Sequence, residues 1–143
     1  MNLKELYSEV IKDHNLSHHN KYLLKDATMS VDGKNPSCGD ELTLYLKIDD
    51  NTLVDASYEG IGCAISQASA SIMIDVMRGK TIDDALQLAH LFFQMIRHEP
   101  ITQIDIKSLE DAVALEPISS MPARVKCATM PWHTLQEALR QTR

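Results

Sequence analysis

The chain has 143 residues, a usual length for one domain, and we expect a single domain over residues 1–143. Hydrophobic residues make up 44% and charged residues 24% of the sequence, a balance that excludes wholesale disorder and a fibrous repeat. The net charge of −6 argues against a nucleic-acid partner, because binding the phosphate backbone requires an excess of cations on one face.

The sequence predicts a cytoplasmic protein that does not contact a membrane. No apolar run reaches the roughly 18 residues of a membrane span. The segment from Met1 to Leu6 already contains charged residues and lacks the apolar core of a signal peptide. An odd number of cysteines, three, argues against a complete set of disulfides. The thiols are therefore expected to be small buried residues, nucleophiles or metal ligands.

The first half of the chain predicts one helix followed by three strands. Apolar residues recur at helical spacing from Leu3 to about His14, and an irregular polar connection is expected over residues 15–20. Alternating apolar and polar residues then predict strands over residues 27–31, 42–48 and 53–58. The turn at Asp49–Asn51 joins the last two strands, so we expect an antiparallel hairpin.

The second half predicts helices. An Ala- and Ser-rich helix is expected from Cys63 to Met77, with Gly79 as its stop signal, and Thr81 resembles the cap of the next helix. Further helices are expected over residues 82–96, from Ser108 to Pro117, and over about 122–140. Pro131 is expected to kink or restart the last helix. The fold class is α+β, a small antiparallel three-stranded sheet covered by helices.

Two of the cysteines lie beside glycine-containing turns. Cys38 lies between two predicted strands, where Pro36 and Gly39 mark a turn, so its thiol is expected at a loop tip. Asp40 follows two residues later and can point into the same space. Cys63 precedes a predicted helix, whose exposed N–H groups and dipole stabilise a thiolate.

Cys127 lies close to two cations, Arg124 and Lys126, which also favour a thiolate. The gaps between the three cysteines match no short zinc-finger pattern, so three unrelated buried cysteines remain an alternative. A solvated basic surface is likewise the alternative for the two cations. His18 and His19 resemble a pair of metal ligands, but adjacent residues rarely converge on one ion, so a solvated loop is expected there.

Three segments, residues 36–40, 60–69 and 122–128, closely resemble the three cysteine motifs of the IscU/NifU-N superfamily of iron–sulfur cluster assembly proteins. The resemblance extends over about residues 5–139. Within the superfamily the match is to the SufU branch, because Lys126 stands where IscU proteins carry a histidine before the third cysteine. The long segment between the second and third cysteines is also typical of SufU proteins.

The resemblance implies a Zn²⁺ site formed by Cys38, Asp40, Cys63 and Cys127. It further implies a zinc-dependent sulfurtransferase, an enzyme that accepts persulfide sulfur from a SufS-type, pyridoxal-phosphate-dependent cysteine desulfurase and works with other iron–sulfur assembly proteins. The alternative is an IscU-like scaffold on which an iron–sulfur cluster is assembled, in which case the protein is not an enzyme. A non-enzymatic zinc module used only for protein contacts is a third possibility.

The physical chemistry of the implied shell assigns roles to individual residues. Three thiolates and one carboxylate suit tetrahedral zinc, but they carry an excess of negative charge that Arg124 and Lys126 are placed to offset. Arg124 is also expected to contact the desulfurase. Cys38 is expected to be the catalytic sulfur acceptor, because a loop cysteine is displaced at lower cost than cysteines anchored at helix starts, as expected for Cys63 and Cys127.

Overall fold

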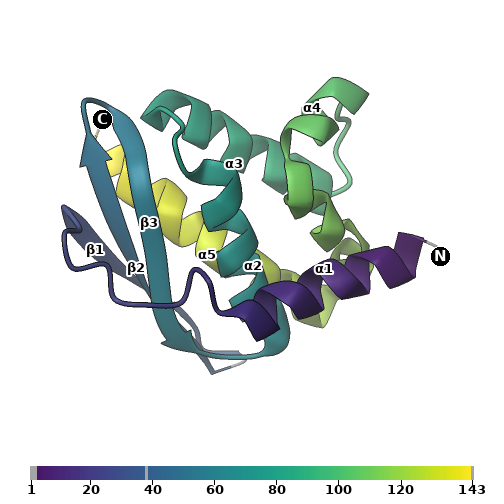
Figure 1. Ribbon diagram of the computed structural model, residues 1–143. Helices are drawn as coiled ribbons and strands as arrows, with labels where there is room; N and C mark the ends of the chain where they lie inside the picture. The colour runs from purple at the N-terminus through teal and green to yellow at the C-terminus, as the bar shows by residue number, and fades with distance from the viewer. Residues whose placement is uncertain (1–2, 38, 143) are drawn as a thin grey trace.

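The computed structural model describes residues 3–37 and 39–142, with side chains described from residue 9 onward. A three-stranded sheet forms one layer, and the helices pack on one of its faces (Figure 1). The elements in chain order are α1 (Leu3–Ser17), β1 (Met29–Asn35), β2 (Asp40–Asp49), β3 (Thr52–Ile61), α2 (Ala64–Met77), α3 (Ile82–Ile96), α4 (Gln103–Ser108), the 3₁₀ helix η1 (Glu110–Ser120) and α5 (Pro122–Gln141). The expected α+β fold is confirmed.

The sheet has the order β1-β2-β3, and both strand pairs are antiparallel. Asp50 and Asn51 adopt φ of 48° and 60° at the turn between β2 and β3, as a tight hairpin with right-handed strand twist requires. The predicted hairpin is therefore confirmed. β1 runs from Met29 to Asn35, beyond the predicted strand over residues 27–31, because it pairs with β2 as far as Asn35↔Asp40.

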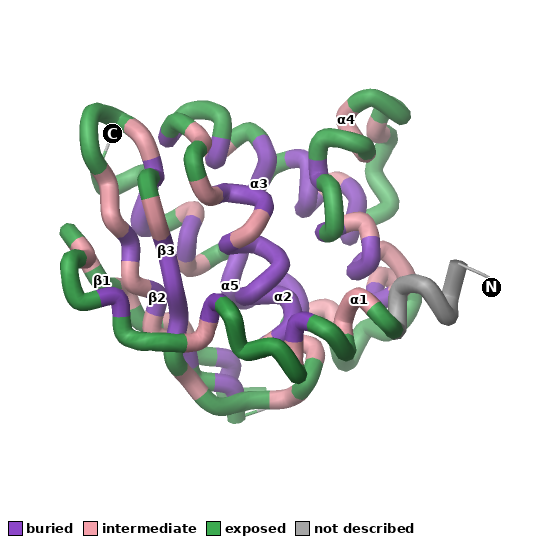
Figure 2. The backbone as a smooth tube through the Cα atoms, in the orientation of Figure 1, coloured by how far each residue is buried: buried purple, intermediate pink, exposed green. Residues whose placement is uncertain are grey.

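α2 is the central helix and is buried along most of its length (Figure 2). Its alanines and serines allow neighbouring elements to approach closely, and it packs against β3, α1, η1 and α5. Next to it, the rings of Phe92 and Trp132 stack with their centroids 3.9 Å apart. This core fixes the amino terminus of α2 relative to α5, which is where the candidate site lies.

Three predicted helix boundaries were wrong. α1 continues through Ser17 instead of ending near His14. Ser108 ends a helix rather than beginning one, because Thr102 caps the unpredicted α4 by accepting a hydrogen bond from the Asp105 amide at 3.1 Å. Pro117 lies inside η1 and does not end it.

The predicted restart at Pro131 is also wrong, because α5 is one helix from Pro122 to Gln141. Its packing on the sheet depends on Gly33 of β1, where an added Cβ would overlap Thr134 Oγ1 of α5. A glycine at this position therefore allows the helix and the strand to approach closely.

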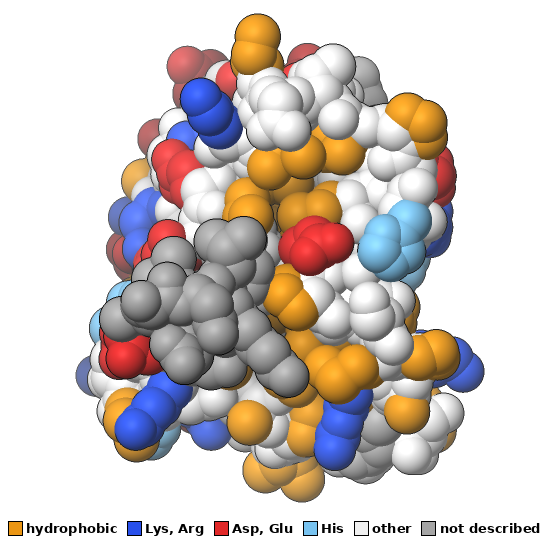
Figure 3. All heavy atoms as spheres, turned by 90° about the vertical axis from the view of Figure 1, so that its right-hand side faces the viewer, with side chains coloured by type: hydrophobic (Ala, Val, Ile, Leu, Met, Phe, Trp, Pro, Cys, Tyr) orange, Lys and Arg blue, Asp and Glu red, His pale blue; other side chains and the backbone are white. Residues whose placement is uncertain are grey.

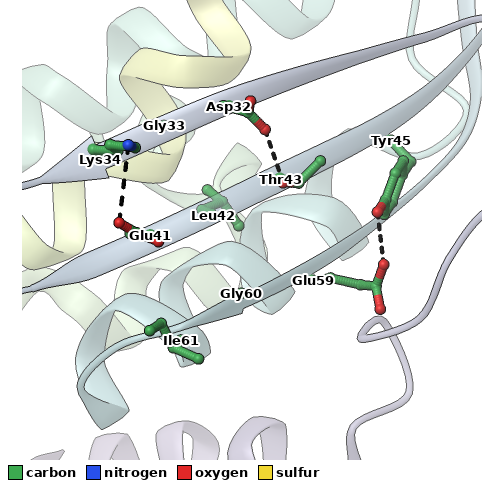
Figure 4. Close-up of a pocket in the computed structure, with 10 residues that line it drawn as sticks. All are labelled: Asp32, Gly33, Lys34, Glu41, Leu42, Thr43, Tyr45, Glu59, Gly60 and Ile61. Carbon is green, nitrogen blue, oxygen red and sulfur yellow. Dashed lines mark hydrogen bonds and ion pairs between the residues drawn. The ribbon is translucent and has the colours of Figure 1, made fainter.

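The outer face of the sheet carries a hollow of about 550 Å³ (Figure 4). Across it, Lys34 and Glu41 form an ion pair at 3.9 Å, and Tyr45 Oη donates a hydrogen bond to Glu59 at 2.6 Å. Its lining residues include none of the sequence-predicted site residues. This hollow is therefore separate from the predicted chemistry.

At the end of the molecule formed by α1 and α4, hydrophobic side chains lie among polar ones on the surface (Figure 3). Leu16 of α1, Ile104 of α4 and Met121 before α5 are among the exposed large hydrophobic residues. Within the described part of the chain, no helix is long and apolar enough to cross a membrane.

Candidate functional site

Three of the four predicted ligands converge from elements far apart in the sequence. Asp40 is the first residue of β2, Cys63 is the N-cap of α2, and Cys127 lies in the second turn of α5. One ligand atom from each lies within 4.8 Å of the others. Cys38 lies outside the described residues, two positions before Asp40, so its participation stays a prediction.

Cys63 occupies the N-cap position of α2, as the sequence predicts. Its backbone is extended, with φ −72° and ψ 166°, and its Sγ accepts a hydrogen bond from the Ser66 amide at 3.5 Å. The first N–H groups of a helix have no partner inside the helix, and the helix dipole is positive at this end. Both features stabilise negative charge on the Cys63 sulfur.

Asp40 is buried, with 1% of its surface exposed, and its carboxylate is held by three donors. Oδ1 accepts hydrogen bonds from the Cys63 amide at 3.0 Å and from Ser66 Oγ at 3.1 Å. Oδ2 accepts one from Asn35 Nδ2 at 3.3 Å. A carboxylate offers roughly four acceptor positions, so it keeps room for one further partner such as a metal ion.

Cys127 is fully buried, and the amide of Asn35 lies against its sulfur. Asn35 Nδ2 is 3.8 Å from Cys127 Sγ while it also donates to Asp40. Asn35 was not predicted as a site residue. Its position directly before the first cysteine motif, and its register opposite Asp40 in the β1–β2 ladder, are the signals that could have found it.

Ser69 links the helix that begins after Cys63 to the helix that contains Cys127. Its Oγ donates to the Ala128 carbonyl at 2.5 Å and accepts from Trp132 Nε1 at 3.0 Å. Gly62 is required for a different reason, since a Cβ there would overlap Asp40 Oδ1 and Ser66 Oγ. The small residues around Cys63 therefore have identifiable structural roles.

Arg124 and Lys126 are both exposed. Arg124 lies three residues, about one helical turn, before the buried Cys127 on α5. Lys126 borders a shallow hollow of about 290 Å³ together with Lys34 and Asn35. Their roles in charge compensation and partner contact stay predictions.

The donor set suits a transition-metal ion. Thiolate sulfur and carboxylate oxygen together are ligands of Zn²⁺, and thiolates also hold iron–sulfur clusters. The buried carboxylate is already oriented by Asn35 and Ser66, which is how protein metal sites fix their ligands. Asp40, Cys63 and Cys127 therefore fit a metal ion, and the alternative of three unrelated cysteines is wrong for Cys63 and Cys127.

Known proteins resemble the chain over nearly its full length. The family described as "NifU-like N terminal domain" matches residues 6–140. The Thermotoga maritima "Iron-sulfur cluster assembly scaffold protein IscU" is 43% identical over 141 residues, which cover 99% of this chain and 97% of the relative. The Bacillus subtilis "Zinc-dependent sulfurtransferase SufU" is 41% identical over 138 residues, which cover 96% and 92%.

A solved structure agrees with these matches. The Fervidobacterium islandicum "Putative iron-sulfur cluster assembly scaffold protein for SUF system (FiSufU)" superposes with a TM-score of 0.87 at 37% identity. The match covers 94% of this chain and 97% of that protein. By fold, by motif and by sequence, the chain belongs to the NifU-like N-terminal domain family, within the IscU/SufU superfamily of iron–sulfur cluster assembly proteins.

Proposed function

We propose that this protein is a zinc-dependent sulfurtransferase that accepts persulfide sulfur from a SufS-type cysteine desulfurase for iron–sulfur cluster assembly. The observation that carries the proposal is the convergence of the buried Asp40 carboxylate with Cys63 and Cys127. An exposed lysine, Lys126, stands where a scaffold of the IscU type would supply a histidine. The Bacillus subtilis relative named a zinc-dependent sulfurtransferase supports the same assignment.

Cys38, Asp40, Cys63 and Cys127 would hold the zinc ion, which when bound would keep the thiols deprotonated and protected from oxidation. Asp40 and Cys63 are held in place by Ser66 and by each other, and Cys127 is buried in a helix. Cys38 lies between β1 and β2 in the sequence, and it is the ligand that we propose leaves the metal during transfer.

Sulfur transfer then requires one substitution at sulfur. The Cys38 thiolate attacks the outer sulfur of the desulfurase persulfide, a new S–S bond forms on Cys38, and the desulfurase cysteine leaves as a thiolate. One S–S bond replaces another, so the step needs no external oxidant or reductant. Arg124, which is exposed and lies about one helical turn before Cys127 on α5, is the residue that we propose contacts the partner during this step.

The assignment of Cys38 can be tested by mass spectrometry. The protein is incubated with a SufS-type desulfurase and cysteine, trapped with an alkylating reagent and digested. The expected result is an additional sulfur atom on the peptide that contains Cys38, and its loss in Cys38→Ser. Sulfur found preferentially on Cys63 or Cys127, or normal transfer by Cys38→Ser, would contradict the proposal.

The partner contact can be tested separately with two arginine variants. Arg124→Ala is expected to weaken stimulation of desulfurase turnover while zinc content stays normal. Arg140→Ala removes an exposed arginine near the far end of the same helix and serves as the matched control. If both variants stimulated desulfurase turnover equally, Arg124 would have no specific role in the partner contact and would be part of a solvated basic surface.

A scaffold role is the second candidate function, because relatives at 43% and 37% identity from Thermotoga maritima and Streptococcus pyogenes are named IscU scaffolds. The same thiolates can hold iron. Anaerobic reconstitution with ferrous iron and sulfide distinguishes the two functions. A stable cluster that is passed to an apo-acceptor protein would favour the scaffold.

A further inference from the structure

A second cluster of potential metal ligands lies at the opposite end of α2 from Cys63. It combines His14 of α1, His19 just after α1, and Asp75 in the last turn of α2, with one ligand atom of each within 4.8 Å of the others. His19 Nε2 lies 2.9 Å from Asp75 Oδ2, and His14 Nε2 lies 3.9 Å from the same oxygen. His18 and His19 are both exposed in the loop after α1, as the sequence predicts, and His19 contacts Asp75 from that loop.

Both imidazoles are oriented by a hydroxyl group on the ring nitrogen that faces away from Asp75. His14 Nδ1 is hydrogen-bonded to Ser71 Oγ at 2.7 Å, and His19 Nδ1 to Ser17 Oγ at 2.6 Å. The two Nε2 atoms are consequently directed toward one carboxylate oxygen. Metal-binding histidines are typically held in this way, with the second nitrogen fixing the ring orientation.

The carboxylate of Asp75 is oriented in the same manner. Its Oδ1 accepts hydrogen bonds from Asn20 Nδ2 at 2.9 Å and from Arg78 Nη1 at 3.2 Å. These donors leave Oδ2 directed at His14 and His19. Each of the three candidate ligands therefore presents one atom to a common point, and each has its other polar atom engaged.

The spacing of these atoms is close to that of a metal site. Ligands bound to a tetrahedral ion at the usual N and O distances lie about 3.3 Å apart. The observed separations of 2.9 and 3.9 Å from Asp75 Oδ2 lie on either side of this value, so small side-chain movements suffice. A fourth ligand is available from solvent or from Asp111 of η1, whose Oδ2 lies 3.8 Å from His14 Nε2.

Burial provides both support and access. His14 is buried, with 6% of its surface exposed, whereas the side chains of His19 and Asp75 are 44% and 33% exposed. A buried imidazole on one side anchors the site, and the two more exposed ligands leave a route from solvent. A metal site needs such a route.

We propose that His14, His19 and Asp75 bind a divalent first-row transition-metal ion at a second site, distinct in position and donor chemistry from the cysteine cluster. Imidazole nitrogen with carboxylate oxygen suits Zn²⁺ and its neighbours in the series. The bound ion would link α1 to the carboxyl end of α2. The proposal does not depend on the sulfurtransferase function, because none of these residues belongs to the cysteine cluster.

Cobalt(II) is the appropriate probe, because its absorption reports its ligands. Thiolate ligands give an intense near-ultraviolet charge-transfer band, whereas a site of nitrogen and oxygen ligands gives visible ligand-field bands without it. In protein whose cysteine site is first filled with zinc, added Co²⁺ is expected to bind at one further equivalent without the thiolate band. If the cysteine site did not hold zinc, only the near-ultraviolet thiolate band would be affected. The visible ligand-field bands of Co²⁺ at the histidine cluster would still appear, so the two proposals can fail independently.

His18 and His19 offer a matched pair of variants. His19→Asn is expected to weaken Co²⁺ binding at the second site by at least about tenfold. His18→Asn should bind Co²⁺ like the wild type, since His18 has a left-handed backbone with φ 52° that asparagine tolerates. Asp75→Asn, which preserves side-chain shape, is expected to weaken binding as His19→Asn does.

Circular dichroism of each variant establishes that a change in binding does not reflect unfolding. The proposal is overturned if the wild type binds no Co²⁺ beyond the cysteine site, or if His19→Asn and Asp75→Asn bind it as well as the wild type. The cluster would then be a hydrogen-bond network that joins α1 to α2.

Discussion

The two ends of α2 carry two clusters of ligand-type side chains that differ in donor chemistry and in burial. Cys63 and Asp75 are twelve residues apart, which places them roughly 18 Å apart along one helix. The cluster at the amino end combines sulfur with a buried carboxylate, and the cluster at the carboxyl end combines imidazole nitrogen with a more exposed carboxylate. One rigid helix thus positions both groups, and the donor atoms determine which ions suit each end.

The helix dipole favours anions at the amino end and disfavours them at the carboxyl end. Cys63 therefore lies where a thiolate is stabilised, whereas Asp75 needs compensation from other groups. Burial raises the pKa of Asp75, but hydrogen bonds from Asn20 and His19 outweigh this effect, and the net pKa of the carboxyl group is lowered. Arg78, the C-cap residue, adds an ion pair at 3.2 Å. The carboxylate at the unfavourable end is kept ionised by its neighbours.

The largest effect that separates the two ends is expected from Cys63→Ala. Loss of a zinc ligand should abolish stoichiometric zinc binding at the cysteine site and destabilise the fold by several kcal/mol, because metal-binding free energy contributes to folding. Zinc content and thermal unfolding measure both effects. Asp75→Asn, at the other end of α2, should leave the cysteine-site zinc in place.

A Cys63→Ala protein with full zinc content and an unchanged melting temperature would remove Cys63 from the metal site. Loss of cysteine-site zinc in Asp75→Asn would show that the two ends of α2 are not independent.

Two serines on α2 provide a finer test, since each supports one cluster. Ser69→Ala removes the partner of Trp132 Nε1 and of the Ala128 carbonyl, both on α5, and should cost about 1–3 kcal/mol of stability. Ser71→Ala removes the hydroxyl group that orients His14 and should weaken Co²⁺ binding at the histidine cluster. Chemical denaturation and cobalt titration of both variants give the comparison.

The clear outcome is that Ser69→Ala lowers stability and leaves Co²⁺ binding at the histidine cluster unchanged, whereas Ser71→Ala weakens that binding. Equal effects of both variants on both clusters would indicate general loosening of α2.

The sequence predicted the elements whose signals are local. The hairpin follows from strand alternation around residues 49–51, and the helix after Cys63 follows from small residues and a glycine stop. α4 was missed because its cap, Thr102, stands outside any strong apolar pattern. Pro117 was misjudged because it lies within a 3₁₀ helix, where the predicted stop does not apply.

Within the sites, the convergence of Asp40, Cys63 and Cys127 was predictable because the motifs are distinctive, but the residues that support them were not. Asn35 reaches Cys127 from 92 positions away, and His19 meets Asp75 across 56 positions. Neither contact has a local sequence signal, because the packing of β1 on α5 creates the first and the packing of α1 on α2 creates the second. Residue pairs of this kind become visible only once the fold is known.

The smallest predicted effect is on the pH dependence of the unfolding free energy. It provides a reference against which acid effects at the two clusters can be measured. Burial lowers the pKa of His133, and the nearby Arg97 lowers it further. His133 stacks on Phe93 with the ring centroids 4.3 Å apart and belongs to neither cluster. Because the folded-state pKa lies below the ordinary value of about 6.5, the unfolded chain takes up the proton first, and stability falls as the pH drops below that value.

His133→Gln should remove this contribution and flatten the dependence of the unfolding free energy on pH between neutral pH and pH 5, by less than the effect of Ser69→Ala. The measurement is denaturation of metal-free protein at several pH values, so that proton competition for metal ligands does not contribute. An unchanged pH dependence in His133→Gln would assign the acid sensitivity to other groups. With this baseline subtracted, any further loss of stability in acid that appears only in the metal-loaded protein reports protonation of the metal ligands themselves.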